Sequence, residues 1–363
     1  MFPIPCSAVL CPRLSEMLKL SLSMRFIPAF LAIIAVFFPG ACASALEEAV
    51  SRKLSGHGEF VYCVRFSPDG KLLASGGEDG GILIHDTASG AVKARLFGHG
   101  EAVSALAFSP DGKYLASAGA DGQLRLWNVL PPGPIRKSKP GRALGAVAFS
   151  PDGAHLAAGG DDGKIYLSAA GSGAPEGELA PPIPSRIAAL AYSPDGIVLV
   201  SASYDGAVRV WSVREKRLLK ELGRHVQPAR AVWSSGDLAI SSGEDGDIKI
   251  WNLQAGSLLR SIKAHSAPIE SFVLSASGRS IISAGWDGAI RFWSITGIKA
   301  GADIKTPETG IYSLSLSQDG RFLASSGPSR DIRLWKLAVS ESRGGLMGKL
   351  QSAGRRILGK TKN

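Results

Sequence analysis

Short runs of alternating hydrophobic and polar residues, separated by turn residues, fill most of this chain. The pattern is clearest in residues 98–128, where VSALAF, KYLASAG and QLRLW each predict a β-strand. SPDG between the first two runs predicts a turn in which Pro110 fixes φ and Gly112 accepts a positive φ. Asp121-Gly122 predicts the next hairpin turn. Three strands cannot bury their faces alone, so this unit needs similar neighbours.

The unit recurs along the chain at intervals of 40 to 43 residues. The position of its last aromatic residue is held in turn by His85, Trp127, Ser168, Trp211, Trp251, Trp293 and Trp335. SPDG recurs at 67–70, 109–112, 150–153 and 193–196, with SQDG at 317–320 and degenerate turns (SSGD, SASG) in the fifth and sixth copies. A repeat of this length predicts one supersecondary unit per copy, stacked on its neighbours.

These motifs carry a resemblance to a known family. GH at 56–57 and 98–99, the SPDG and DG turns, and the strand ends LWN, VWS, IWN, FWS and LWK are similar to those of the WD-repeat family. The resemblance covers residues 48–337 and implies an all-β fold, a seven-bladed β-propeller whose blades are four-stranded antiparallel sheets.

The ends of the repeat array predict how the ring closes. AVSRKLSGH at 49–57 matches the outer-strand sequence AVKARLFGH at 91–99 but has no blade of its own before it. After Trp335 the corresponding stretch reads ESRGGLMGKL, which is no strand pattern. We therefore expect the N-terminal strand to complete the last blade, which leaves no open seam.

The sequence before the repeats resembles a secretory leader. An apolar run, FIPAFLAIIAVFF, follows Met24-Arg25 and precedes ACASA, which predicts a signal cleaved after Ala43 or Ala45. An uncleaved anchor and a lipid anchor at Cys42 are the alternatives, and Met24 is a candidate start. We expect a leader at 1–43, a propeller at 44–340 and a basic tail at 341–363.

The 44 glycines support a fold of many strands and turns, and the charge is uneven. The formal net charge is +10, but residues 341–363 hold six basic side chains and one acidic one. The propeller is therefore nearly balanced, and we expect no nucleic-acid partner. Cleavage of the leader would leave Cys63 as the remaining cysteine, so no internal disulfide is expected.

The family resemblance implies a hydrogen-bonded chain of His, Ser, Asp and Trp inside each complete blade. Complete sets are His99-Ser117-Asp121-Trp127, His225-Ser241-Asp245-Trp251 and His265-Ser283-Asp287-Trp293. The other blades are incomplete, with His57, Ser75 and Asp79 in the first, Asp162 in the third, Ser201, Asp205 and Trp211 in the fourth, and Ser325 and Trp335 in the seventh.

These sets look like Ser/His/Asp triads, so a catalytic interpretation needs weighing. A nucleophile needs access and an oxyanion site, whereas here the serine is mid-strand and the set recurs from blade to blade. We interpret the sets as structural and predict no catalytic residue. No spare histidine pair has metal-ligand spacing, so neither a metal site nor a cofactor is predicted.

In WD-repeat propellers partners commonly dock on the face that carries the DG turns and the starts of the inner strands. The candidate partner-binding residues there are Phe60, Tyr62, Arg186, Tyr204, Arg230, Trp286 and Tyr312. The aromatic members on the sixth, seventh and first blades would become neighbours when the ring closes. Clusters of exposed aromatic residues are typical of binding hot spots. The alternative is that they pack into neighbouring blades.

The leading hypothesis is an exported, non-enzymatic, monomeric propeller that binds an unidentified protein partner. A propeller hydrolase or ligand binder that uses the central channel is the second, for which Arg186, Arg230 and Glu270 are the convergent ionisable groups. The third is weak membrane-surface contact through residues 344–360, whose apolar and basic positions alternate at helical spacing but contain several glycines. A solvated tail is the alternative there.

Overall fold

The computed structural model describes residues 51–337, which belong to one compact unit. The predicted leader, the tail at 341–363 and residues 344–360 lie outside the described residues. Within residues 51–337 the regular structure is 28 β-strands and no helix. They form seven four-stranded antiparallel sheets, so the predicted all-β fold and seven blades are confirmed.

Six blades contain four consecutive strands, named from the innermost to the outermost. Blade 1 has β2 (Val61–Phe66), β3 (Leu72–Gly77), β4 (Ile82–Asp86) and β5 (Val92–Leu96). Blade 2 has β6 (Val103–Phe108), β7 (Tyr114–Gly119), β8 (Leu124–Asn128) and β9 (Gly133–Ser138). Blade 3 has β10 (Leu144–Phe149), β11 (His155–Gly160), β12 (Ile165–Ala169) and β13 (Pro175–Leu179).

The second half of the chain repeats this order. Blade 4 has β14 (Ile187–Tyr192), β15 (Val198–Ser203), β16 (Ala207–Ser212) and β17 (Arg217–Arg224). Blade 5 has β18 (Ala229–Ser235), β19 (Leu238–Gly243), β20 (Asp247–Asn252) and β21 (Ser257–Lys263). Blade 6 has β22 (Ile269–Leu274), β23 (Ser280–Gly285), β24 (Ala289–Ser294) and β25 (Ile304–Lys305).

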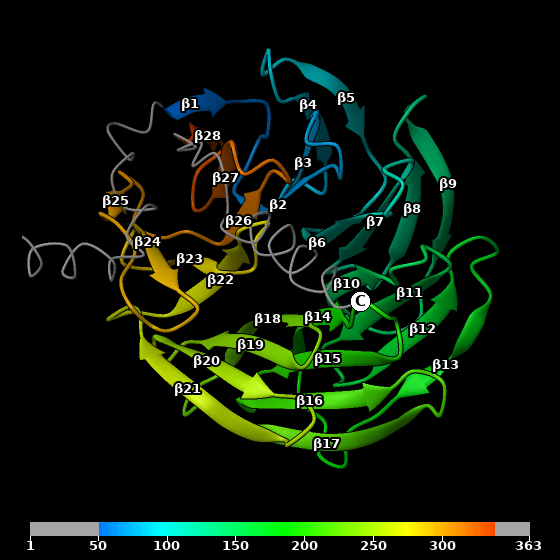
Figure 1. Ribbon diagram of the computed structural model, residues 1–363. Helices are drawn as coiled ribbons and strands as arrows, with labels where there is room; N and C mark the ends of the chain where they lie inside the picture. Colours follow the sequence, from blue (N-terminus) through cyan, green and yellow to red (C-terminus); the bar gives the residue numbers. More distant parts are fainter. Residues whose placement is uncertain (1–50, 338–363) are drawn as a thin grey trace, which may run out of the picture. The chain divides into compact units, whose positions relative to one another are not determined.

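Blade 7 closes the ring. It combines β26 (Ser313–Leu316), β27 (Phe322–Ser326) and β28 (Ile332–Lys336) with β1 (Ser51–Leu54) from the start of the described chain. Strand β1 pairs antiparallel with β28, with Ser51 opposite Trp335 and Leu54 opposite Ile332. Figure 1 shows the blue N-terminal strand beside the orange-red β28. The predicted closure is confirmed.

The hydrophobic core lies between neighbouring blades. One cluster combines Leu72 and Ile84 of blade 1 with Leu115 and Trp127 of blade 2, and comparable clusters recur around the ring. At the closure, buried Leu54 of β1 shares a cluster with residues of blades 7 and 1. Each blade thus buries its two apolar faces against two neighbours, as the repeat pattern requires.

The SPDG turns form as their chemistry predicts. In blade 2 the Ser109 hydroxyl donates to Asp111 (2.6 Å) and accepts the Tyr114 backbone N–H (2.9 Å). Gly112 has φ of 72°, which favours glycine. The turn closes the hairpin between β6 and β7 and fixes its register.

Candidate interaction surface

The structure brings together the four polar residues of blade 2. His99 lies 2.7 Å (Nε2) from the Ser117 hydroxyl and 3.0 Å (Nδ1) from the Asp121 carboxylate. The Trp127 indole N–H also donates to the Ser117 hydroxyl, at 2.9 Å. Ser117 is 0% exposed, and its hydroxyl oxygen is hydrogen-bonded to both His99 and Trp127. A substrate therefore has no access to this hydroxyl, and Ser117 cannot act as a nucleophile.

Blades 5 and 6 have the same geometry. The His Nε2 to Ser Oγ distances are 2.8 Å for His225-Ser241 and 2.8 Å for His265-Ser283. The Nδ1 atoms lie 2.9 Å from Asp245 and Asp287, and Trp251 and Trp293 donate to the serines at 2.8 and 3.1 Å. These contacts join the loop before the innermost strand to the second strand, the third strand and the DG turn of the blade.

Blade 1 departs from this set at one position. His57, Ser75 and Asp79 interact as in blade 2, but His85 fills the tryptophan position and is 0% exposed. Neither ring nitrogen of His85 has a hydrogen-bond partner within residues 51–337. Burial lowers the pKa of His85, the nearby backbone of Ser55 opposes this shift in part, and His57 and Arg95 lower the pKa further.

Blades 3 and 4 replace the missing histidine by side chains that the sequence motif did not identify. In blade 3 the Tyr166 hydroxyl donates to Asp162. In blade 4 the buried guanidinium of Arg209 donates to Ser203 (2.9 Å) and forms an ion pair with Asp205. Both replacing residues lie on the third strand of the blade, whereas the motif histidine precedes the first strand. Alignment of the repeats at the GH motif therefore does not identify them.

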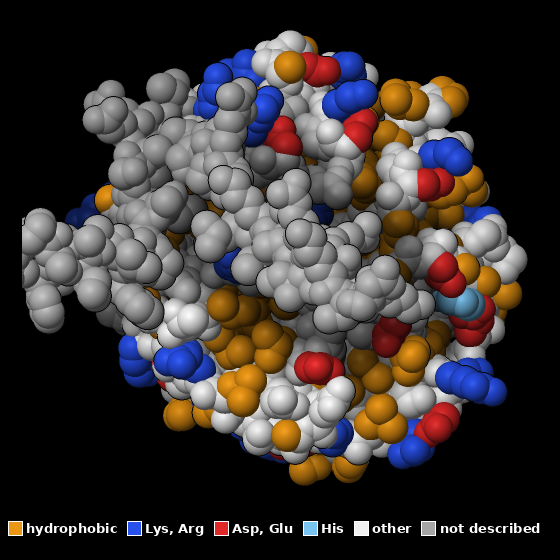
Figure 2. Space-filling model, in the orientation of Figure 1, with side chains coloured by type: hydrophobic (Ala, Val, Ile, Leu, Met, Phe, Trp, Pro, Cys, Tyr) orange, Lys and Arg blue, Asp and Glu red, His pale blue; other side chains and the backbone are white. Residues whose placement is uncertain are grey.

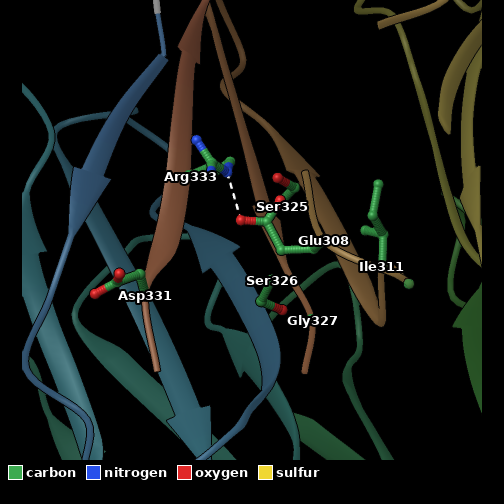
Figure 3. Close-up of a pocket in the computed structure, with 8 residues that line it drawn as sticks. Glu308, Ile311, Ser325, Ser326, Gly327, Asp331 and Arg333 are labelled. Carbon is green, nitrogen blue, oxygen red and sulfur yellow. Dashed lines mark hydrogen bonds and ion pairs between the residues drawn. The ribbon is translucent and has the colours of Figure 1, made fainter. Parts of the chain in front are cut away.

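Blade 7 lacks both the His and the DG aspartate, and an ion pair stands in their place. The Arg333 guanidinium donates to Glu308 at 2.6 Å, while Trp335 keeps its bond to Ser325 at 3.0 Å. Beside them lies a cavity of about 10 Å³, which Figure 3 shows with the side chains of Glu308, Ser326 and Arg333 around it. That volume is close to the minimum for one water molecule, so it is no substrate pocket.

The innermost strands of blades 1 to 6 have a β-bulge near their start. The register shifts between Val61 and Cys63 in blade 1, and the same irregularity recurs in blades 2 to 6. Bulges redirect side chains. The residues skipped at these bulges are Tyr62, Ser104, Gly145, Ala188, Arg230 and Glu270.

A continuous chain of contacts crosses this face from blade 3 to blade 6. The Arg186 guanidinium pairs with Asp161 (2.9 Å) and lies over the Tyr204 ring, 4.9 Å from its centroid. Arg230 lies over the same ring at 4.8 Å and donates to Glu270 at 2.6 Å. Glu270 in turn accepts the indole N–H of Trp286 at 2.9 Å. Four of the seven predicted partner-binding residues are thus linked.

The other three lie on blades 1 and 7. The Tyr62 and Tyr312 rings have centroids 5.8 Å apart, so this pair packs across the junction of the two blades. Phe60 is 41% exposed and Trp286 is 52% exposed, whereas both tyrosines are half-buried. The expected apposition of blades 7 and 1 therefore holds for the tyrosines, and Phe60 and Trp286 are the more exposed of these four aromatic side chains.

The ionisable groups predicted for the central channel, Arg186, Arg230 and Glu270, are each held in an ion pair. Arg186 forms an ion pair with Asp161, and Arg230 forms one with Glu270. These side chains are therefore not free to act as a general acid or base. No cluster of three or more His, Cys, Asp or Glu side chains suited to a metal is found within residues 51–337. Burial raises the pKa of the Cys63 thiol to about 12, which makes it a poor nucleophile at neutral pH.

Charge on the molecular surface is mixed. On the face seen in Figure 2, acidic and basic side chains alternate around the rim with hydrophobic ones between them. No large patch of one sign is visible there, in contrast to a nucleic-acid-binding face. Across the 287-residue span 51–337 there is also no helix long and apolar enough to cross a membrane.

Seven four-stranded blades with internal His-Ser-Asp-Trp hydrogen bonds define the class as a WD-repeat β-propeller. The family model described as IFT122 first beta-propeller matches residues 43–294, and the model described as WD domain, G-beta repeat matches residues 302–336. The first match covers more than two thirds of the chain, and the chain belongs to this family of WD-repeat propellers. Propellers of this kind commonly serve as protein-interaction scaffolds and are typically non-enzymatic.

Related WD-repeat proteins match this chain over a stretch about one repeat long. WD repeat-containing protein 1-B of Xenopus laevis is 57% identical over 37 residues, which is 10% of this chain and 6% of that protein. WD repeat-containing protein 1 of Xenopus tropicalis is 54% identical over 37 residues, with the same coverage. The matched stretch is about one blade in length, so the likeness extends to the repeat and not to the whole of those proteins.

Proposed function

We propose that this protein is a non-enzymatic, monomeric interaction scaffold that binds a protein partner through the face carrying Trp286. The observation that carries the proposal is the anchored exposure of that side chain, with its indole N–H held by Glu270 and 52% of its surface exposed. A large aromatic group that is already fixed loses little conformational entropy on binding, which favours its use as a hot spot.

The contact chain behind Trp286 supports this proposal. Glu270 is held by Arg230, and Arg230 by the Tyr204 ring, so the position of Trp286 is set through three blades. Tyr62 and Tyr312 add a second aromatic pair at the neighbouring blades. Together they form a surface whose apolar groups have fixed positions and whose charged groups are neutralised in pairs.

Binding can be tested by affinity capture with purified wild-type and Trp286→Ala protein. Leu258→Ala is the matched control, because Leu258 is an exposed apolar residue on the outer strand β21. We expect Trp286→Ala to weaken capture of the principal partner at least tenfold, because loss of a hot-spot side chain costs about 2 kcal/mol of binding free energy. Leu258→Ala is expected to capture the partner as the wild type does. Undiminished capture by Trp286→Ala would show that this face is not the binding surface.

We further propose that the propeller acts outside the cytoplasm, after removal of the leader near Ala43 or Ala45. The support is the positive start, apolar run and small-residue exit of residues 24–45. Expression of the full chain, fractionation and N-terminal sequencing test it. A cytoplasmic protein that retains residues 1–43 would overturn export and leave the binding proposal intact. Sedimentation of the purified protein tests the monomeric state separately.

A further inference from the structure

Arg65 stands out among the residues that line the axis. Strand register places one residue of each inner strand at the same level: Arg65, Ala107, Ala148, Ala191, Trp233, Val273 and Ser315. Arg65 is the single charged residue of this level. Its strand, β2, runs from the GH loop toward the SPDG turn, so Arg65 lies near the SPDG end of the axis, away from Trp286.

The Arg65 guanidinium uses one of its nitrogens within the protein. The NH1 group donates to the backbone oxygen of Val64 (2.9 Å), to the Ser313 hydroxyl (3.3 Å) and to the backbone oxygen of Leu314 (3.4 Å). The Nε and NH2 groups have no hydrogen-bond partner and no ion pair with a carboxylate in the described part of the chain. Two donors of the planar fork therefore remain for a ligand.

Within the described residues, the surroundings of Arg65 supply no counter-charge. Water reaches the Arg65 side chain, yet protein on the innermost strands surrounds it, and this burial lowers the pKa of the guanidinium. The ionisable neighbour that acts on it is the Cys63 thiol and not a carboxylate. Because the side chain is open to water and faces no carboxylate of the described chain, its guanidinium is available to an anion that enters from solvent.

Two serine hydroxyls of blade 7 lie at the same place. The Ser313 hydroxyl accepts the Val64 backbone N–H (3.3 Å), and the Ser315 hydroxyl accepts the Phe66 backbone N–H (2.9 Å). Neither hydroxyl donates its own hydrogen to an acceptor among residues 51–337, so both can donate to a bound anion. Apart from the bond to Val64, the contacts of Arg65 and these serines cross the junction between β2 and β26, where the ring closes.

We propose that Arg65, with Ser313 and Ser315, forms a binding site for a small oxyanion at the junction of blades 7 and 1. A phosphate or carboxylate group suits the site, because the guanidinium fork matches two oxygens of such a group and hydroxyls donate to the same oxygens. The anion supplies the missing counter-charge and joins the first and last blades, and so stabilises the closed ring through mass action.

The test is thermal unfolding of the folded propeller in phosphate, in acetate and in chloride at constant ionic strength, with calorimetric titration of inorganic phosphate. We compare the wild type with Arg65→Gln, Arg65→Lys and the matched control Arg321→Gln, an exposed arginine beside an SPDG-type turn. Phosphate is expected to raise the melting temperature of the wild type and the control, while Arg65→Gln weakens phosphate binding about tenfold or more.

The arms of the experiment separate the sources of the oxyanion. A rise with phosphate and not with acetate assigns the site to phosphate groups, and a rise with both assigns it to oxyanions in general. Arg65→Lys keeps the charge without the fork and is expected to bind more weakly than the wild type but more strongly than Arg65→Gln. An equal phosphate response in wild type and Arg65→Gln, or no response in the wild type, overturns the proposal.

Discussion

Tyr62 and Tyr312 belong to blades 1 and 7, yet their ring centroids lie 5.8 Å apart with an interplanar angle of 41°. They meet on the face that carries the DG turns, while β1 and β28 pair at the outer edge of the same junction. Two independent contacts therefore close the ring, one near the axis and one at the rim. Mutation at each contact should therefore lower the free energy of unfolding separately.

The tyrosine pair should show a coupling free energy in a double-mutant cycle. Tilted aromatic pairs contribute about 0.5–1.5 kcal/mol beyond the area that they bury. We expect Tyr62→Leu and Tyr312→Leu to lower the free energy of unfolding individually, and the double variant to lose less than the sum. Urea unfolding of the four proteins gives the coupling, and additive losses would show that the rings do not interact.

Removal of one side chain of β1 should weaken the rim contact. Leu54 is buried in the cluster between blades 7 and 1, so Leu54→Ala is expected to lower the free energy of unfolding by about 2–5 kcal/mol. Lys53→Ala is the matched control, because the exposed ammonium group of Lys53 pairs with Asp331 at the surface and such pairs contribute about 0–1 kcal/mol. Equal losses in the two variants would contradict the role of β1 in closure.

The serine of a complete blade should matter more than the serine of an incomplete one. Ser117→Ala removes the partner of both His99 and Trp127, and we expect a loss of about 1–3 kcal/mol. Ser325→Ala removes the partner of Trp335 alone, for an expected loss of about 0.5–1.5 kcal/mol. Chemical denaturation measures both, and a larger loss at Ser325 would show that the histidine bond adds nothing.

The sequence predicted the repeat, the blade count and the closure because each is encoded locally. Alternating strands and turn residues recur at a fixed spacing, and the match of residues 49–57 to 91–99 needs no three-dimensional information. The replacements inside incomplete blades were not predicted. Arg209 and Tyr166 reach the DG aspartate from the third strand, so their role depends on side-chain length and direction within the blade.

The sequence predicted which residues belong to the candidate surface, but it did not predict which of them contact one another. The aromatic residues before the DG turns were visible in the repeat alignment, but the sequence gives no distance between residues of different blades. The stacking of two guanidinium groups on Tyr204 and the anchoring of Trp286 by Glu270 depend on how neighbouring blades are oriented. The β-bulge near the start of the inner strands of blades 1 to 6, at which Tyr62 and Arg230 lie, has no sequence signature in this chain.

Restoring a tryptophan in blade 1 should stabilise the propeller. His85 pairs with Leu73 in the same register in which Trp127 pairs with Leu115, so the indole N–H of His85→Trp is expected to reach the Ser75 hydroxyl. The gain expected for that hydrogen bond is about 1 kcal/mol. His85→Phe is the control, since it supplies an aromatic ring without the donor. A tryptophan variant less stable than the phenylalanine variant would mean that the site cannot accommodate the indole.

His85 should also make the propeller sensitive to acid. Burial lowers the pKa of His85 below its ordinary value of 6.5, and the same direction holds for His57, His99 and His265. Below pH 6.5 the unfolded chain therefore binds protons that the folded chain does not, so the free energy of unfolding falls as the pH falls. For one such group the slope approaches about 1.4 kcal/mol per pH unit between the unfolded and folded pKa values.

Comparison of wild type and His85→Phe isolates the contribution of this one histidine. Above about pH 8 all four histidines are almost fully neutral in both states, so the two stability curves should run parallel there and differ by a constant packing difference. Between pH 6.5 and 5 the wild type should lose stability faster than His85→Phe, because the variant has no proton to gain on unfolding at this position. The aspartates of the sets, whose pKa values are lowered from 3.8, contribute their losses below this window. The measurement is the urea midpoint of both proteins between pH 5 and pH 8. Parallel stability curves down to pH 5 would show that His85 is protonated equally in the folded and unfolded chain.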